Sequence, residues 1–324
     1  MMTKTSLSRS WLSTTRTSLL TQAMTMAAAT LISTAGYAAD KCGTVNLADP
    51  GWSDSNVTTT TAAMLLKSLG YDAKITMLSV PVSYESLANG QMDAFLGNWM
   101  PAQQKFHDSY VASGKVEQLS KNLHGTEFTL AVPKYVYEQG IKSFADLAKH
   151  GDEFDHKIYG IEPGAPANQS IQTMIDHNEF GLKGWTLVES GEQAMLSEVK
   201  RAVNRKKGIV FLGWTPHPMN VNFELAYLSG GEKYFGSAGD VFTLTRKGFK
   251  DHCPNVAALL SNLDFSLTME NTVMTDVLEN GTAADKAVDS WIKANPAQLD
   301  SWLKDVTTAD GAEGLAAARK ALLN

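Results

Sequence analysis

The sequence predicts an α/β protein with two similar lobes and a ligand-binding cleft between them. Strand-like runs alternate with single helix-like runs, which is typical of a mostly parallel sheet. This alternation starts again near residue 128, as expected for a second lobe. In each half, one strand ends in Phe-Leu-Gly with a Trp close behind, in "FLGNWMP" (95–101) and "FLGWTPHP" (211–218).

The first half predicts three strands and two helices. The run "TVNLAD" (44–49) is short and β-rich, and the turn "PGWSD" follows it. In the helix after this turn, apolar residues recur near helical spacing, Asp54 is a candidate N-cap and Gly70 ends the helix. The predicted strands are 44–49, 72–80 and 92–97, and the predicted helices are 55–70 and 83–90.

The second half repeats this pattern, and the C-terminal remainder is predicted to be largely helical. The predicted strands are 128–133, 157–164 (which runs into a Gly/Pro loop), 184–190 and 208–214, and the predicted helices are 143–151 with Ser143 as its cap, 168–181, 192–207, 255–263, 269–280, 282–296, 296–306 and a last Ala-rich helix. We assign residues 39–122 and 226–324 to lobe 1 and residues 123–225 to lobe 2. In open sheets of this kind, ligands bind beyond the carboxyl ends of the strands.

Residues 1–38 have the features of a secretory signal peptide. Three basic residues precede a moderately apolar run at about 19–32, and small residues follow, so we expect cleavage after Ala38 or Ala39. The alternative is a transmembrane anchor. It is disfavoured because the run is too short to span a bilayer and polar residues interrupt it. The sequence therefore predicts an exported protein.

The charge balance is acidic. The whole chain has 28 Lys+Arg and 34 Asp+Glu, a net charge of −6. Removal of residues 1–38 takes away three basic and no acidic residues, so 25 basic residues then face 34 acidic ones and the charge is −9. Without a basic stripe or an Arg-rich run, nucleic acid is not expected as a partner.

The chain has two cysteines, Cys42 and Cys253. An even number of cysteines in an exported protein favours a disulfide, which would tie the start of the mature chain to a late element. The alternative is two buried free thiols. No His or Cys neighbours stand at ligand spacing, so we expect no metal site.

No sequence motif indicates catalysis or a cofactor. A nucleophile elbow, a zinc-protease motif, a phosphate loop and a dinucleotide fingerprint are all missing from the sequence. The seven histidines are scattered. His217, close to Trp214, either lines a cleft or is a structural loop residue, and the second interpretation is favoured.

Four aromatic side chains stand where a core residue is not expected. Trp52, Trp99 and Trp214 each follow a predicted strand beside Gly or Pro, and Phe128 opens a strand. Core aromatic residues normally lie inside periodic elements, as the tryptophans of the C-terminal helices do. Large apolar side chains exposed at strand ends usually mark an interaction surface. We therefore predict that these four side chains line the cleft.

Several aromatic faces around one cleft suit a quaternary ammonium ligand. Such a cation has no N–H to donate, whereas aromatic faces offer it negative potential and apolar contact together. Asp54 is predicted to supply the opposite charge and to accept a hydrogen bond from a ligand hydroxyl. Its alternative role is the helix N-cap described above.

Six motifs resemble one family of transport proteins. They are "GWSD" (51–54), "FLGNWMP" (95–101), "TLAVPKYVY" (129–137), "IYGIEPG" (158–164), "ESGEQAML" (189–196) and "FLGWTPHPMN" (211–220). Nearly end to end, the mature chain resembles the periplasmic substrate-binding proteins of ABC importers for choline and related compatible solutes, and most of all the choline-binding branch. The resemblance implies a type II periplasmic binding protein, whose lobes close over the ligand and deliver it to a membrane permease.

The resemblance also implies the site. The aromatic box of the family falls on Trp52 and Trp99 from lobe 1, and on Phe128 and Trp214 from lobe 2. Asp54 matches the acidic residue that meets the choline hydroxyl.

Two positions depart from the choline pattern. Phe128 stands where Tyr is usual and Ala165 stands where an Asn is usual, so polar contacts to the variable end of the ligand are lost. Nearby Asn168 is a candidate to compensate in part. Choline is the leading ligand, with glycine betaine, carnitine or trimethylamine N-oxide as alternatives. A carboxylate ligand would need a donor such as His217 and would be repelled by Asp54.

The sequence thus predicts a periplasmic binding protein that performs no chemistry. The alternative from another class is a periplasmic enzyme acting on a quaternary ammonium compound. That alternative lacks a motif for a nucleophile–base pair or a metal.

Overall fold

The computed structural model describes residues 42–324, so the predicted signal peptide (1–38) lies outside the described residues. The strands are β1 (Thr44–Asp49), β2 (Asp72–Met77), β3 (Ala94–Met100), β4 (Val116–Pro133), β5 (Lys157–Tyr159), β6 (Thr186–Val188), β7 (Phe211–Thr215), β8 (Leu225–Tyr227) and β9 (Gly239–Arg246). The helices are α1 (Ser53–Ser68), α2 (Val80–Ala88), α3 (Gln104–Tyr110), α4 (Lys134–Glu138), α5 (Phe144–Leu147), α6 (Pro166–Asp176), α7 (Glu192–Asn204), α8 (Met219–Asn222), α9 (Glu232–Phe235), α10 (Phe249–His252), α11 (Pro254–Asn262), α12 (Leu267–Asn280), α13 (Ala284–Ala294), α14 (Gln298–Trp302) and α15 (Gly314–Leu322), with 3-10 helices η1 (Ala148–Phe154) and η2 (Glu179–Gly181). No helix in this range is both long and apolar enough to cross a membrane.

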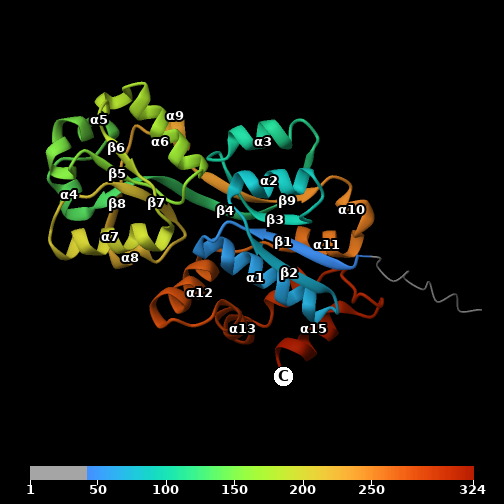
Figure 1. Cartoon of the computed structure of the whole chain (residues 1–324). Helices are drawn as coiled ribbons and strands as arrows, with labels where there is room; N and C mark the ends of the chain where they lie inside the picture. The colour runs from blue at the N-terminus through green and yellow to red at the C-terminus, as the bar shows by residue number, and fades with distance from the viewer. Residues whose placement is uncertain (1–41) are drawn as a thin grey trace, which may run out of the picture. The chain divides into compact units, whose positions relative to one another are not determined.

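The strands form two parallel groups joined by antiparallel strands. The order is β2-β1-β3-β9-β4-β7-β5-β6, and β8 pairs with β4 (Figure 1). Strand β1 is parallel to β2 and β3, and β5 is parallel to β6 and β7. The predicted two-lobed α/β fold is confirmed, but the sheet is mixed, whereas the sequence predicted a mostly parallel one.

Strand β4 belongs to both groups. Its residues 116–126 pair with β9, and its residues 127–131 pair with β7. The sequence predicted only the end of this strand, from residue 128. The earlier part escaped prediction because three register shifts against β9 break the alternation of buried and exposed residues.

Strand β9 corrects the prediction of a largely helical C-terminal remainder. It lies between β3 and β4 and pairs antiparallel with both. The run "GDVFTLTR" is rich in β-branched and aromatic residues, which favour a strand. The C-terminal helices then follow as predicted, from α11 to α15.

The predicted disulfide is confirmed. Cys42 and Cys253 are bonded, with their Cα atoms 5.1 Å apart. The bond ties Cys42, two residues before β1, to the junction of α10 and α11, across 211 positions of sequence.

The lobe boundaries stay a prediction. Strand β8 (Leu225–Tyr227) spans the predicted boundary at 226 and pairs with β4 beside β7. The Phe235 ring of α9 packs against Phe128 and Phe144, at 5.9 and 6.0 Å between centroids. Strand pairing and packing therefore favour a chain that returns to the β9 group after Phe235.

Candidate functional site

One cavity brings all five predicted site residues together. Its walls are Trp52, Asp54, Trp99, Ala102, Gln103, Phe128, Ile161, Pro166, Ala167 and Trp214. The walls come from α1, β3 and its following turn, β4, the segment into α6, and β7. The cavity therefore lies where the two strand groups meet.

Three of the four aromatic side chains, Trp99, Phe128 and Trp214, form a contiguous wall. The Phe128 ring lies 6.1 Å from Trp99 and 6.1 Å from Trp214, measured between centroids, and Phe128 and Trp214 are register partners in β4 and β7. Trp52 takes the N-cap position of α1. Trp99 lies inside β3 (Ala94–Met100) and does not follow the strand as predicted, and Trp214 lies inside β7, which continues to Thr215.

The Gly of each Phe-Leu-Gly motif permits close packing beneath these rings. A Cβ on Gly97 would stand 2.8 Å from the Ser55 hydroxyl of α1. A Cβ on Gly213 would stand 2.9 Å from the Ala131 side chain in β4. Neither distance is compatible with a larger residue, so both motifs need Gly to place the following Trp.

Asp54 is a buried helical residue. The sequence left open an N-cap role, and that role is wrong because the N-cap of α1 is Trp52. Its Oδ2 accepts a hydrogen bond from Trp99 Nε1 at 2.9 Å, and its Oδ1 has no partner among the described residues. Burial, reinforced by the nearby Glu192 charge, raises the pKa of the Asp54 carboxyl to about 7.

A second buried carboxyl, Glu270 of α12, is affected by the charge of Asp54. Glu270 is 1% exposed, and neither of its oxygens has a hydrogen-bond partner among residues 42–324. Burial, followed by the charge of Asp54, raises the pKa of Glu270 well above its usual value. The two carboxyls therefore resist being ionised together.

Ala165, which stands where the choline pattern has Asn, does not line the cavity. Ala165 is the N-cap of α6, and the residues beside it, Pro166 and Ala167, provide the wall. The Asn168 amide is fully used: it accepts from Ile161 N at 3.0 Å and donates to three oxygens of the chain. Asn168 therefore does not replace the missing ligand contact.

Sequence reasoning missed Gln103. This residue is 1% exposed, lines the cavity, and donates from Nε2 to the Gly97 carbonyl at 2.7 Å. That bond leaves its buried Oε1 without a partner in the described part of the chain. Trp214 Nε1 is likewise buried and unpartnered. Unpartnered polar atoms beside a cavity are free to meet a ligand.

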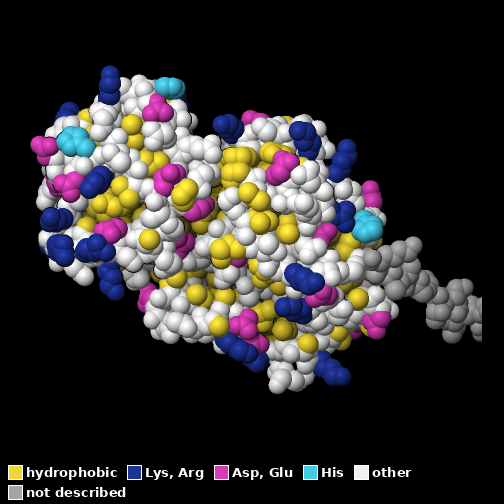
Figure 2. Space-filling view, viewed as in Figure 1, with side chains coloured by type: hydrophobic (Ala, Val, Ile, Leu, Met, Phe, Trp, Pro, Cys, Tyr) yellow, Lys and Arg dark blue, Asp and Glu magenta, His cyan; other side chains and the backbone are white. Residues whose placement is uncertain are grey.

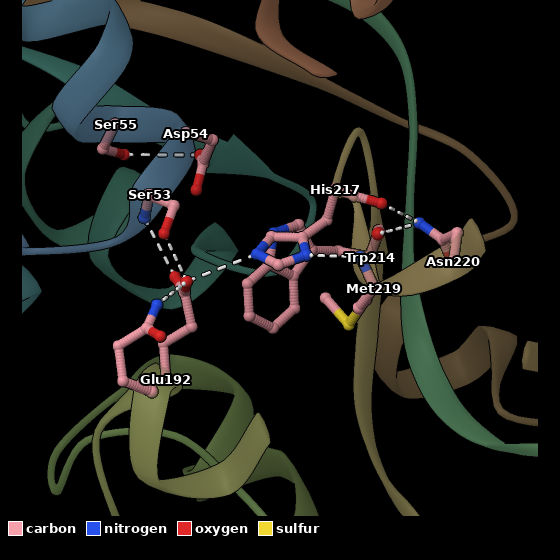
Figure 3. Close-up of polar contacts among 9 residues, drawn as sticks. Ser53, Asp54, Ser55, Glu192, Trp214, His217, Met219 and Asn220 are labelled. Atoms are coloured by element: carbon pink, nitrogen blue, oxygen red, sulfur yellow. Dashed lines mark hydrogen bonds and ion pairs between the residues drawn. The ribbon is translucent and has the colours of Figure 1, made fainter. Parts of the chain in front are cut away.

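Two glutamates, the buried Glu192 and the partly buried Glu162, were also missed, and they connect segments on either side of the cavity. Trp52 Nε1 donates to Glu162 Oε2 at 2.9 Å. Glu192 binds Ser53 on one side and His217 on the other (Figure 3). His217 does not line the cavity, and its Nδ1 accepts from Met219 N, so the structural interpretation of this histidine is supported. No group of three or more His, Cys, Asp or Glu among residues 42–324 is arranged to hold a metal.

The fold and the cavity define a two-lobed substrate-binding protein, and the comparisons identify its family. Residues 43–294 match the substrate-binding domain of ABC-type glycine betaine transport systems. The chain belongs to this family and is therefore the substrate-binding component of an ABC transporter.

Solved structures resemble the chain over most of its length. An ABC-transporter choline-binding protein in complex with choline is 49% identical, with a TM-score of 0.85, and the match covers 87% of this chain and 98% of that one. The same kind of protein in an unliganded semi-closed conformation gives 48% and 0.80, covering 87% and 99%. Lactococcal OpuAC in complex with glycine betaine gives 29% and 0.74, covering 81% and 100%.

Curated relatives agree with this family. The glycine betaine/carnitine transport binding protein GbuC of Listeria monocytogenes is 32% identical over 163 residues, which is 50% of this chain and 54% of that protein. The glycine betaine/proline betaine-binding periplasmic protein of Escherichia coli is 23% identical over 319 residues, covering 87% and 96%.

Proposed function

We propose that this protein captures choline and delivers it to the membrane permease of its transporter. The observation that carries the proposal is the cavity walled by four aromatic side chains and one carboxylate. Each aromatic face contributes about 0.5–2 kcal/mol to binding a cation, most when water is excluded. Four such faces and the buried methyl groups together approach the ~8 kcal/mol that micromolar affinity requires.

The unpartnered polar atoms favour choline over a carboxylate ligand. Asp54 Oδ1 and Gln103 Oε1 are acceptors, and a choline hydroxyl has one proton to donate. Glycine betaine offers no donor to either atom, and Asp54 would repel its carboxylate. Glycine betaine is the second candidate, because the buried Trp214 Nε1 is a free donor for a carboxylate oxygen.

Export and the lack of catalysis belong to this proposal. The periplasmic relatives support cleavage of residues 1–38 and a periplasmic location. The family consists of substrate-binding transport proteins, which supports a protein that binds and releases its ligand unchanged. Lobe 1 (39–122 and 226–324) and lobe 2 (123–225) would close around that ligand.

On the face seen in Figure 2, basic side chains are scattered with acidic ones among them.

Calorimetry of the mature protein tests the ligand. Choline, glycine betaine, carnitine and trimethylamine N-oxide are titrated at pH 8. We expect choline to bind most tightly, at micromolar Kd or below. Tighter binding of glycine betaine would replace choline as the substrate, and absence of binding by all four would overturn the proposed function.

A further inference from the structure

We propose that Glu192 is a positioning residue that holds the cleft closed by capping helix α1 from the opposite lobe. The inference rests on the proposed function only for its ligand-binding readout. We call the three side chains involved, Ser53, Glu192 and His217, the Glu192 bridge.

The first half of the bridge joins two helix N-termini that are far apart in sequence. Ser53 opens α1 directly after β1, and Glu192 opens α7 after β6. Glu192 Oε2 accepts from Ser53 N at 2.9 Å, and Oε1 accepts a short hydrogen bond from the Ser53 hydroxyl (Figure 3). The N-cap of α1, Trp52, supplies no capping bond of its own. The carboxylate thus satisfies an end of α1 that its own sequence leaves open, and it matches the positive end of the helix dipole.

The second half of the bridge fixes the carboxylate from its own lobe. His217 Nδ1 accepts from Met219 N at 3.0 Å, so the ring proton is on Nε2, which lies 3.3 Å from Glu192 Oε1. Gln193 Nε2 also donates to Oε1, at 2.9 Å. Glu192 is 5% exposed and His217 is 2% exposed. Burial alone would raise the pKa of Glu192, but the bonds from His217 and Ser53 lower it below its usual value, so the carboxylate stays ionised.

The bridge lies beside the aromatic box without lining the cavity. The His217 ring stands edge-on to Trp214, 5.1 Å between centroids, and Ser53 follows Trp52 in sequence. Neither Glu192 nor His217 is among the cavity walls. The bridge therefore connects one box residue from each side while making no contact with a ligand. In an open cleft, water would solvate both Ser53 N–H and the carboxylate, so the bonds favour only the closed form.

Because the Glu192 bridge lies outside the cavity, its effect on ligand release can be predicted quantitatively. Loss of the bridge should weaken every ligand by the same factor, because only the closed population changes. We expect Glu192→Ala to raise the dissociation rate about tenfold or more. This factor corresponds to the free energy that hydrogen bonds to charged groups contribute. At pH 8, where Asp54 is mostly ionised with or without the Glu192 charge, choline and tetramethylammonium should lose affinity equally, since Glu192 meets neither the hydroxyl nor the headgroup.

The experiment compares Glu192→Ala and Glu192→Gln with the control Glu198→Gln on the same helix. Glu198 is partly exposed, pairs with Arg201 at 3.1 Å and does not belong to the Glu192 bridge. Stopped-flow Trp fluorescence gives dissociation rates for both ligands, and small-angle X-ray scattering gives the radius of gyration without ligand. Both Glu192 variants should release ligand faster and show a larger ligand-free radius, whereas the control should match the wild type.

Three results would overturn the inference. The first is unchanged rates and radius in both Glu192 variants. The second is a loss restricted to choline, which would make Glu192 a ligand contact. The third is failure of both variants to fold, which would make the carboxylate a fold determinant. If the wild type binds neither ligand, the proposed function fails, and the ligand-free scattering alone decides the role of the bridge.

Discussion

Asp54 supplies the carboxyl group in the wall of the cavity. Its carboxyl is buried in the cavity wall, with Oδ2 bound to Trp99 and Oδ1 without a partner among residues 42–324. The pKa of its carboxyl is raised to about 7, first by burial and then by Glu192. A quaternary ammonium keeps its charge at every pH, so its affinity follows the ionisation of Asp54.

Choline affinity should therefore rise with pH around neutrality. The cation favours ionised Asp54, lowers its pKa and releases a proton on binding. With a free-state pKa of about 7, the affinity should fall about tenfold between pH 8 and pH 6. Calorimetry at several pH values measures this slope. Asp54→Asn should bind choline more weakly with no slope between these values, and an equal slope in the variant would assign the effect to another group.

The residues that sequence reasoning found and those it missed differ in one respect. Trp52, Trp99 and Trp214 stand beside strand ends within recognisable motifs, so their role was readable locally. Gln103 and Glu192 look like ordinary polar residues of a turn and a helix. Their importance comes from burial and from partners distant in sequence, which no local pattern reports.

At the scale of elements, helix α12 places an unsatisfied carboxyl behind the site. It packs against α1, which carries Asp54, and its buried face includes Glu270. Because the pKa of Glu270 is raised, the folded protein holds a proton that the unfolded chain releases. The contribution of this group to stability is greatest in acid and is lost as the pH rises above the ordinary Glu range.

The variant Glu270→Gln should remove this loss of stability. A neutral amide keeps the shape of the side chain and does not titrate, so the melting temperature of the variant minus that of wild type should increase from pH 5 to pH 8. A change of a few degrees is expected. Thermal unfolding at each pH measures it. Glu198→Gln should show no trend, and a flat difference for Glu270→Gln would show that Glu270 is ionised in the folded protein.

Most elements were predictable because their periodicity is local. Strand β1 has the predicted bounds, and α1, α7 and α12 differ by only a few residues. Strand β9 and the first part of β4 were not predicted. In β4, the register shifts hide the alternation. The β9 run has residues that favour a strand, but its place in the sheet depends on pairing with β3 and β4, which are distant in sequence.

At the scale of the whole described chain, the two strand groups are connected in three ways. Strand β4 runs through both, the Glu192 bridge and the Trp52–Glu162 bond join them beside the cavity, and aromatic rings from both groups meet at Phe128. The two-lobe architecture followed from the repeated strand motif. The mixed sheet did not, because strand order depends on long-range pairing.

The central claim is that the aromatic cavity recognises a cation, and a matched pair of ligands tests it most directly. Choline and 3,3-dimethylbutan-1-ol share a shape and a hydroxyl, but only choline is charged. In calorimetry at pH 8, choline should bind at micromolar Kd or below and the alcohol at least about a hundredfold more weakly, because it lacks the cation–π and Asp54 attractions. Equal affinities would contradict the account and leave an apolar pocket without charge recognition.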